Sequence, residues 1–148
     1  MSIFISYNHN DKDYAQKLFE TLQKQGLDAW YDDLIEFGED IEKISAQKYE
    51  ETDAVIFIMT PQSVASSTIQ AELEKLKGLG KKIYPFLLEN VAENPFPNLR
   101  YVDVRGGELP PERFYKQLQS LNIHGRMAGD TTTAAPPPDV SKKKKGGE

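Results

Sequence analysis

Five short apolar runs alternate with helical patterns along the chain, and this alternation limits its possible folds more than any other feature. The strongest run is "AVIFIMT" at residues 54–60, which is almost entirely apolar. Such a strand is typical of the centre of a parallel sheet, where both faces are buried. The other four strands are predicted in "SIFISY", "LDAWYDD", "IYPFLLE" and "LRYVDV", the last of them at an edge.

The segments between these runs predict helices. Apolar side chains recur on one helical face over residues 14–22, and Gly26 follows where that helix should end. Further helices are expected in "IEKISAQKYEE", which is less periodic, in "SSTIQAELEKL", and in "PERFYKQLQSL", where Pro111 would lie in the first turn. "PQSVASS" at residues 61–67 is expected to be a loop. The pattern predicts an α/β fold, a flavodoxin-like three-layer sandwich with a five-stranded parallel sheet in the order 2-1-3-4-5.

Length and composition indicate one globular domain. The chain has 148 residues, of which 39% are hydrophobic and 28% charged. We expect the domain to span residues 1–122. Residues 123–148 lack apolar spacing and are rich in Pro, Thr and Lys, so they are expected to form a disordered linker or tail.

Charge and residue usage exclude several classes of function. A net charge of −5 repels phosphate backbones, so nucleic acid is not an expected partner. The absence of cysteine excludes disulfides and thiolate chemistry and is compatible with the cytoplasm, where we expect the protein. His9 and His124 lie far apart in the sequence, and no metal site is expected. No apolar run approaches the ~20 residues that span a membrane, so a membrane partner is not expected either.

The predicted strand order places a binding site at the carboxyl ends of the first and third strands, where the crossovers leave in opposite directions. The helix after the third strand carries Glu72 and Glu74. With Ile69, Leu73 and Leu76 as its buried stripe, Glu72 lies about 60° from the stripe and Glu74 about 130°. Glu74 therefore belongs to the solvated face. For Glu72 an ordinary role at the start of the helix is the commoner interpretation, and a functional role stays open.

The order of these segments resembles the TIR domain family (Toll/interleukin-1 receptor domains), especially its bacterial members. "IFISYNHNDKDYAQKLFETLQKQGLDAWYDD" is similar to the opening of the family, and the "EFG" that follows is similar to its BB loop. "AVIFIMTPQSVASS" and "KKIYPFLLE" are similar to its third and fourth strands. The resemblance covers residues 1–122. A phospho-receiver shares the sheet order, but "IFIMTP" lacks the aspartate that such a protein needs at this strand end.

In TIR domains that are enzymes, a catalytic glutamate lies six residues after a serine and just before a leucine or similar residue, and Ser66, Glu72 and Leu73 match that spacing. The resemblance implies an NAD+ glycohydrolase that cleaves the nicotinamide–ribose bond to give nicotinamide and ADP-ribose or a cyclic relative. It also implies activity on self-assembly, in signalling or defence. The departing nicotinamide leaves positive charge on the ribose, which a nearby anion stabilises. Glu72 is thus the expected catalytic residue, with NAD+ as substrate and no cofactor.

The resemblance also implies contacts with the nucleotide. The residues expected to border it follow the first strand, lie in the BB loop or open the helix of Glu72: Tyr7, Asn8, His9, Asn10, Glu36, Gly38, Ser66 and Thr68. Two positions depart from the family. Thr68 stands where many members have tryptophan, and Asn8 with His9 stands where some have paired arginines. For His9, a solvent-exposed loop histidine is an equal alternative.

A second function stays open. Many eukaryotic relatives are non-catalytic adaptors, which bind other TIR domains through the BB loop. Here that loop begins at Leu34 and ends at Asp40, and it is the expected surface for self-association in either case. The loss of the aromatic residue at Thr68 favours the adaptor, whereas the presence of Glu72 favours the enzyme.

Overall fold

The structure, a computed structural model, describes residues 2–130 and the side chains of residues 2–121. It divides into two compact units: residues 2–110 hold the sheet, and the last helix belongs to the other unit and is described by itself. In chain order the elements are β1 (Ser2–Ser6), η1 (His9–Asp11), α1 (Lys12–Lys24), β2 (Asp28–Trp30), η2 (Asp32–Leu34), α2 (Ile41–Glu51), β3 (Ala54–Met59), α3 (Pro61–Ala65), α4 (Ser67–Gly78), β4 (Lys82–Leu87), β5 (Val102–Asp103) and α5 (Glu112–Asp130).

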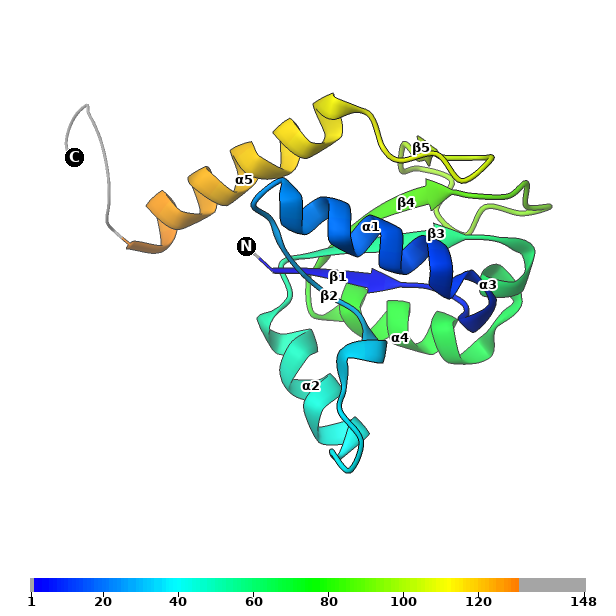
Figure 1. The fold of residues 1–148 in the computed structure, drawn as a ribbon, viewed down its shortest axis with the longest axis horizontal. Helices are drawn as coiled ribbons and strands as arrows, with labels where there is room; N and C mark the ends of the chain where they lie inside the picture. The colour runs from blue at the N-terminus through cyan, green and yellow to red at the C-terminus, as the bar shows by residue number, and fades with distance from the viewer. Residues whose placement is uncertain (1, 131–148) are drawn as a thin grey trace. The chain divides into compact units, whose positions relative to one another are not determined.

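The sheet has the predicted order, β2-β1-β3-β4-β5, and every neighbouring pair is parallel (Figure 1). β3 lies at the centre with all six of its residues buried. The two outer strands are short, since β2 has three residues and β5 has two. The predicted fold class is confirmed, and so is the edge position of the fifth strand.

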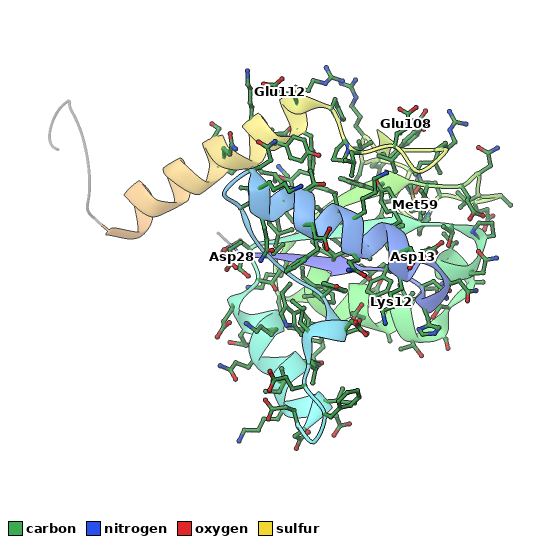
Figure 2. The ribbon with its side chains drawn as sticks, viewed as in Figure 1. Lys12, Asp13, Asp28, Met59, Glu108 and Glu112 are labelled. Atoms are coloured by element: carbon green, nitrogen blue, oxygen red, sulfur yellow. The ribbon has the colours of Figure 1, made fainter. Side chains whose placement is uncertain are left out.

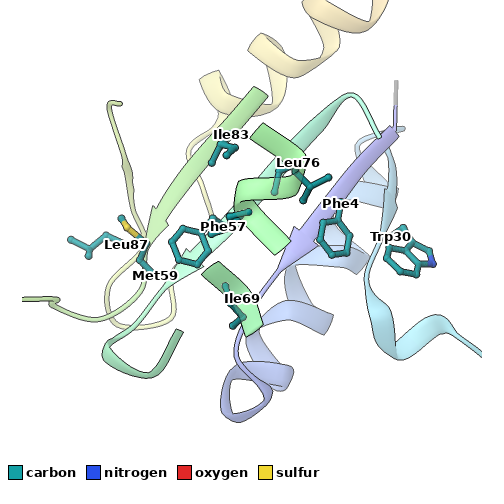
Figure 3. Packing of buried hydrophobic residues seen from close by; sticks show 10 residues of the cluster. Phe4, Trp30, Phe57, Met59, Ile69, Leu76, Ile83 and Leu87 are labelled. Atoms are coloured by element: carbon teal, nitrogen blue, oxygen red, sulfur yellow. The ribbon is translucent and has the colours of Figure 1, made fainter. Parts of the chain in front are cut away.

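Side chains alternate between the two faces of the sheet, as strand geometry requires. One face holds Phe4 of β1 and Phe57 of β3, on which the apolar stripe of α4 packs (Figure 3). Partly buried side chains of α2, including Tyr49, join the same cluster. α1 lies on the other side of the sheet (Figure 1). Because Ser6 follows Phe4 by two residues in β1, its side chain points toward the face of α2 and α4.

Helix α1 ends as the sequence predicts. Its buried side chains are Tyr14, Ala15, Leu18 and Leu22, and it ends at Lys24. Gly26 follows with a φ of 77°, a left-handed conformation that glycine adopts without strain. Figure 2 shows Lys12 and Asp13 at the opposite end of this helix.

The segment after β3 differs from the expected loop, because residues 61–65 form the short helix α3. Thr60 and Ser63 make reciprocal bonds at its start: the Ser63 N–H donates to Thr60 Oγ1 at 3.2 Å, and the Thr60 N–H donates to Ser63 Oγ at 2.9 Å. Pro61 occupies the first turn, where its missing N–H costs nothing. This capping box makes five residues helical where the Pro and Ser content favoured a loop.

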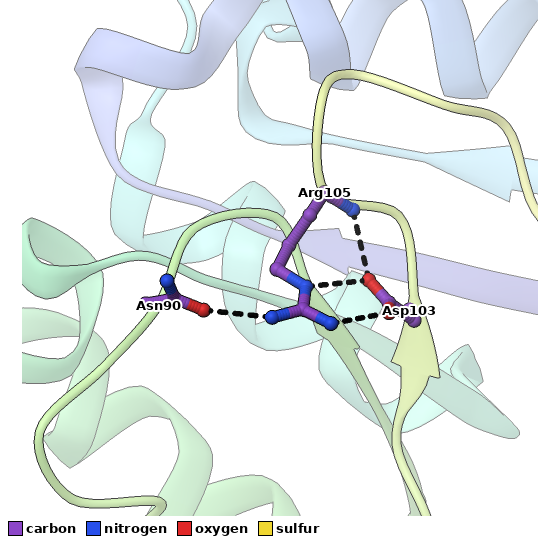
Figure 4. A network of polar contacts seen from close by, with 3 residues as sticks. All are labelled: Asn90, Asp103 and Arg105. Carbon is purple, nitrogen blue, oxygen red and sulfur yellow. Dashed lines mark hydrogen bonds and ion pairs between the residues drawn. The ribbon is translucent and has the colours of Figure 1, made fainter.

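Polar contacts link parts of the chain between β4 and α5 to one another. Arg105 donates to both carboxylate oxygens of Asp103, at 2.9 Å and 2.7 Å, and to Asn90 Oδ1 at 2.9 Å (Figure 4). The hydrogen bonds from Arg105 lower the pKa of Asp103 to about 2. The network joins the segment after β4 to the end of β5.

Helix α5 begins at Glu112, so Pro111 lies just before the first turn in which it was expected. The helix continues past residue 122, the predicted end of the domain, to Asp130. The rest of the predicted tail, residues 131–148, lies outside the described residues. Within the described part of the chain, no helix is both long and apolar enough to cross a bilayer.

Candidate active site

The position of Glu72 is set by the packing of α4. Ser66 caps this helix, because its Oγ accepts the Ile69 N–H at 3.2 Å. Ile69, Leu73 and Leu76 are buried against the sheet and fix the rotation of the helix. Glu72 is consequently half-buried at the margin of the stripe, while Glu74 is exposed. The predicted difference between the two carboxylates is confirmed.

Two hydroxyl groups from other elements hold the Glu72 carboxylate. Ser6, the last residue of β1, donates from Oγ to Glu72 Oε1 at 2.9 Å. Tyr49, near the end of α2, donates from its hydroxyl to Glu72 Oε2 at 2.5 Å. Each carboxylate oxygen thus has a protein donor, and each can accept a further bond because a carboxylate offers about four acceptor sites.

Burial and neighbouring charge set the protonation of Glu72. Burial raises its pKa most, the hydrogen bonds from Tyr49 and Ser6 lower it, and the negative charge of Asp32 raises it again. The pKa of Tyr49 is also raised, by burial and by its bond to Glu72, so Tyr49 keeps its proton at neutral pH. When Glu72 is ionised, its charge lies in a partly dehydrated place, where it acts more strongly than in water.

A pocket of about 170 Å³ lies beside the end of β1 and is lined by Tyr7, His9, Asp32 and Asp33. The Tyr7 hydroxyl donates to Asp32 Oδ1 at 2.7 Å. Lys12, labelled in Figure 2, forms an ion pair with Asp33, with Nζ 3.2 Å from Oδ1. Tyr7 follows Ser6 directly, so the pocket and the carboxylate of Glu72 share the carboxyl end of β1.

Among the expected nucleotide contacts, Tyr7 and His9 line this pocket together, and His9 is exposed. Asn8 caps η1, because its Oδ1 accepts the Asn10 N–H at 3.0 Å. Thr68 is exposed on α4, one turn before Glu72 and on the same side of the helix.

The two nucleotide contacts expected in the BB loop are not among the residues that line this pocket. Glu36 and Gly38 are exposed between η2 and α2, and Gly38 has a φ of 88°. The hydrogen bonds to Glu72 come from Ser6 and Tyr49, so they do not involve this loop.

Sequence reasoning missed three residues around Glu72. Ser6 could have been found, because alternation in the first strand places it on the same face as Phe4. Tyr49 was hard to find, because apolar residues recur only weakly on one face of the helix that holds it. Asp32 was placed only within the predicted strand "LDAWYDD", yet it accepts a hydrogen bond from the Tyr7 hydroxyl and its charge acts on Glu72.

Solved structures with a similar fold come from several kinds of protein. The TIR domain of the Toll-related receptor TRR-2 from Hydra magnipapillata superposes with a TM-score of 0.59 at 17% identity, covering 85% of this chain and 97% of that one. A 2-deoxyribosyltransferase from Bacillus psychrosaccharolyticus superposes with a TM-score of 0.57 at 14% identity, covering 78% of this chain and 96% of that one. The Clostridium botulinum CMP N-glycosidase BcmB superposes with a TM-score of 0.53 at 16% identity, covering 80% of this chain and 99% of that one. These likenesses establish the fold alone.

The sequence itself decides the family. No curated protein matches the chain. The TIR domain family model matches residues 3–120, which include β2 to β5, all of β1 except Ser2, and the Glu72 site. This protein therefore belongs to the TIR domain family.

Proposed function

We propose that this TIR domain is an NAD+ glycohydrolase, which cleaves the nicotinamide–ribose bond with Glu72 as its catalytic carboxylate. The observation that carries the proposal is a half-buried carboxylate, held by two hydroxyls at the carboxyl edge of the sheet. As nicotinamide leaves, positive charge develops on the ribose, and a fixed anion beside the sugar lowers the energy of that state. The products would be nicotinamide and ADP-ribose or a cyclic relative.

The names of two fold relatives support this class of reaction. One is a 2-deoxyribosyltransferase and the other a CMP N-glycosidase, so both names refer to chemistry at the bond between a sugar and a base. Their identities of 14% and 16% carry no residue roles to this chain. They support the view that this fold accommodates cleavage at an N-glycosidic carbon.

The size of the pocket supports activity on assembly. Sites for small molecules usually have volumes of about 300–1,000 Å³. The pocket beside β1 has about 170 Å³, room for only part of a dinucleotide. In our proposal Tyr7 and His9 border one part of NAD+, and a neighbouring copy of the domain supplies the rest of the enclosure. The domain would thus act when copies gather, in signalling or defence.

Mass spectrometry of NAD+ incubated with the protein tests the proposal. The protein is assayed dilute, concentrated, and immobilised densely on beads. We expect nicotinamide to appear, with the rate per molecule rising on concentration or immobilisation. If no nicotinamide forms in any of these states, the proposed activity is wrong.

The exposed BB loop favours a second candidate, a non-catalytic adaptor that binds other TIR domains. Phe37 at the loop's tip has a relative exposure of 107%, and Leu34 and Ile41 beside it are also exposed, at 41% and 66%. Large apolar side chains exposed along one short segment make that segment a candidate interaction site. An adaptor would associate through this loop and leave NAD+ intact.

Phe37→Ser should weaken self-association by at least about tenfold in Kd, because an exposed aromatic side chain buried at an interface commonly contributes a large share of the binding energy. Sedimentation equilibrium over a range of protein concentrations measures the effect. Leu79→Ser is the control, since Leu79 is exposed at 44% at the end of α4 and outside the loop. Equal association of Phe37→Ser and the unmodified protein would show that another surface is used.

A further inference from the structure

The two hydroxyls that meet at Glu72 come from elements far apart in the sequence. Ser6 ends β1 and Tyr49 lies near the end of α2, while Glu72 lies on α4. With one donor on each oxygen, rotation of the carboxylate about its last bond would break both hydrogen bonds. The orientation of Glu72 therefore depends on where β1 and α2 place their donors.

The position of Tyr49 is itself fixed by packing. Its ring meets Phe4 edge-on, with the centroids 5.6 Å apart and an interplanar angle of 71°. Phe4 in turn stacks on Trp30 at 5.2 Å. Lys75 Nζ lies over the Tyr49 ring, 5.8 Å from its centroid. The packing of the Tyr49 ring against the core thus fixes the direction in which its hydroxyl points.

The groups that face Glu72 act on its charge in opposite directions. Ser6 from β1 and Tyr49 from α2 donate hydrogen bonds, which favour the ionised form. Burial and the negative charge of Asp32 from η2 favour the protonated form. Lys75, on α4 itself, faces the Tyr49 ring. Without the Tyr49 hydroxyl, only the hydrogen bond from Ser6 would favour the ionised form of Glu72 against burial and the charge of Asp32.

We propose that Tyr49 is a positioning residue, whose hydroxyl keeps Glu72 ionised and oriented for the reaction, an inference that rests on the proposed function. Only an ionised Glu72 can stabilise positive charge on the ribose. Tyr49 does not touch the substrate in this account. It acts through its bond to Oε2, which leaves other acceptor sites of the carboxylate for the hydroxyls of the sugar.

Tyr49→Phe tests the proposal directly, because it removes the hydroxyl and keeps the ring on Phe4. Protein labelled with ¹³C at the glutamate carboxyl is titrated by NMR, with the Glu72 signal assigned by its loss in Glu72→Gln. We expect the midpoint for Glu72 to rise by about 1 to 2 pH units, the equivalent of one hydrogen bond to a charged group. Ser6→Ala should move it in the same direction.

Tyr14→Phe is the matched control. The Tyr14 hydroxyl donates to the Glu108 carbonyl at 2.7 Å, so this variant also loses a tyrosine hydrogen bond, but at a place other than Glu72. The midpoint for Glu72 should stay unchanged in Tyr14→Phe. A midpoint in Tyr49→Phe equal to that of the unmodified protein would overturn the inference, whether or not the domain cleaves NAD+.

The pH profile of nicotinamide release supplies the second measurement. Because Tyr49→Phe raises the pKa of Glu72, a larger fraction of the variant is protonated and inactive at low pH. The deficit of Tyr49→Phe should be about 10- to 100-fold on the acid side and shrink as the pH rises past the new midpoint. A deficit that is constant with pH would refute the effect on ionisation. A domain that releases no nicotinamide at any pH would refute the proposed function, and the NMR titration would still decide whether Tyr49 controls Glu72.

Discussion

Glu72→Gln is expected to release nicotinamide from NAD+ at least about 100-fold more slowly than the unmodified domain, the size of effect found when one electrostatic contact to a transition state is lost. Glutamine has nearly the same shape as glutamate but cannot carry the negative charge. The Ser6 and Tyr49 hydroxyls can still bond to its amide group, so the fold around position 72 should be kept. Mass spectrometry of nicotinamide under clustering conditions measures the rate.

Glu74→Gln provides the matched control for this experiment. It makes the same chemical change two residues away on the same helix, at an exposed position. Its rate should equal that of the unmodified domain, and thermal melts of both variants should show that each is folded. Equal rates for Glu72→Gln and Glu74→Gln would remove Glu72 from the reaction and leave catalysis to another group.

Phe57→Ala is expected to lower the free energy of unfolding by about 3–5 kcal/mol, because it opens a large cavity in the core. Phe57 lies in the central strand with a relative exposure of 1%, on the face covered by α4 (Figure 3). Its ring also meets Phe96 edge-on, with the centroids 5.9 Å apart. Since domains of this kind have total stabilities of about 5–15 kcal/mol, this loss is a large share of the total. Urea unfolding followed by circular dichroism measures the loss.

Phe37→Ala is the control for this stability experiment. It removes the same aromatic ring from a fully exposed position in the BB loop, where nothing is buried by it. Its free energy of unfolding should remain within about 0.5 kcal/mol of that of the unmodified protein, provided that the measurement is made at a concentration at which the protein is monomeric. A loss below 1 kcal/mol in Phe57→Ala would mean that α4 does not depend on this ring for its packing.

The fold could be predicted from the sequence because its strongest signals are local. The apolar run at residues 54–59 fits only a strand with both faces covered, and that strand occupies the centre of the sheet. Gly26 marks the end of α1 by its own conformation. α3 was missed because its stability depends on the side chain of Ser63, which bonds to the backbone of Thr60 as well as to that of Ile58. A five-residue helix formed in this way has no repeating pattern to detect.

The candidate site could be predicted only in part. Helical geometry separates Glu72 from Glu74, because both lie on one element whose buried stripe is regular. The donors to Glu72 come from β1 and α2, and their distances depend on the packing of three elements that no local pattern encodes. The same limit applies to the pair of Tyr7 and Asp32, which are 25 residues apart in the sequence. Roles that arise within one element can thus be read from sequence, whereas hydrogen bonds between elements require the structure.

The two outer strands also bear on how copies of the domain can meet. With three residues in β2 and two in β5, the borders of the sheet offer few free amide and carbonyl groups to a second polypeptide. Crowded molecules therefore have little opportunity to continue one another's sheets. Side chains on loops and helices offer more surface for contacts between copies than these short strands do. Short outer strands thus reduce the tendency of neighbouring copies to pair edge to edge as strands do in amyloid-like fibres.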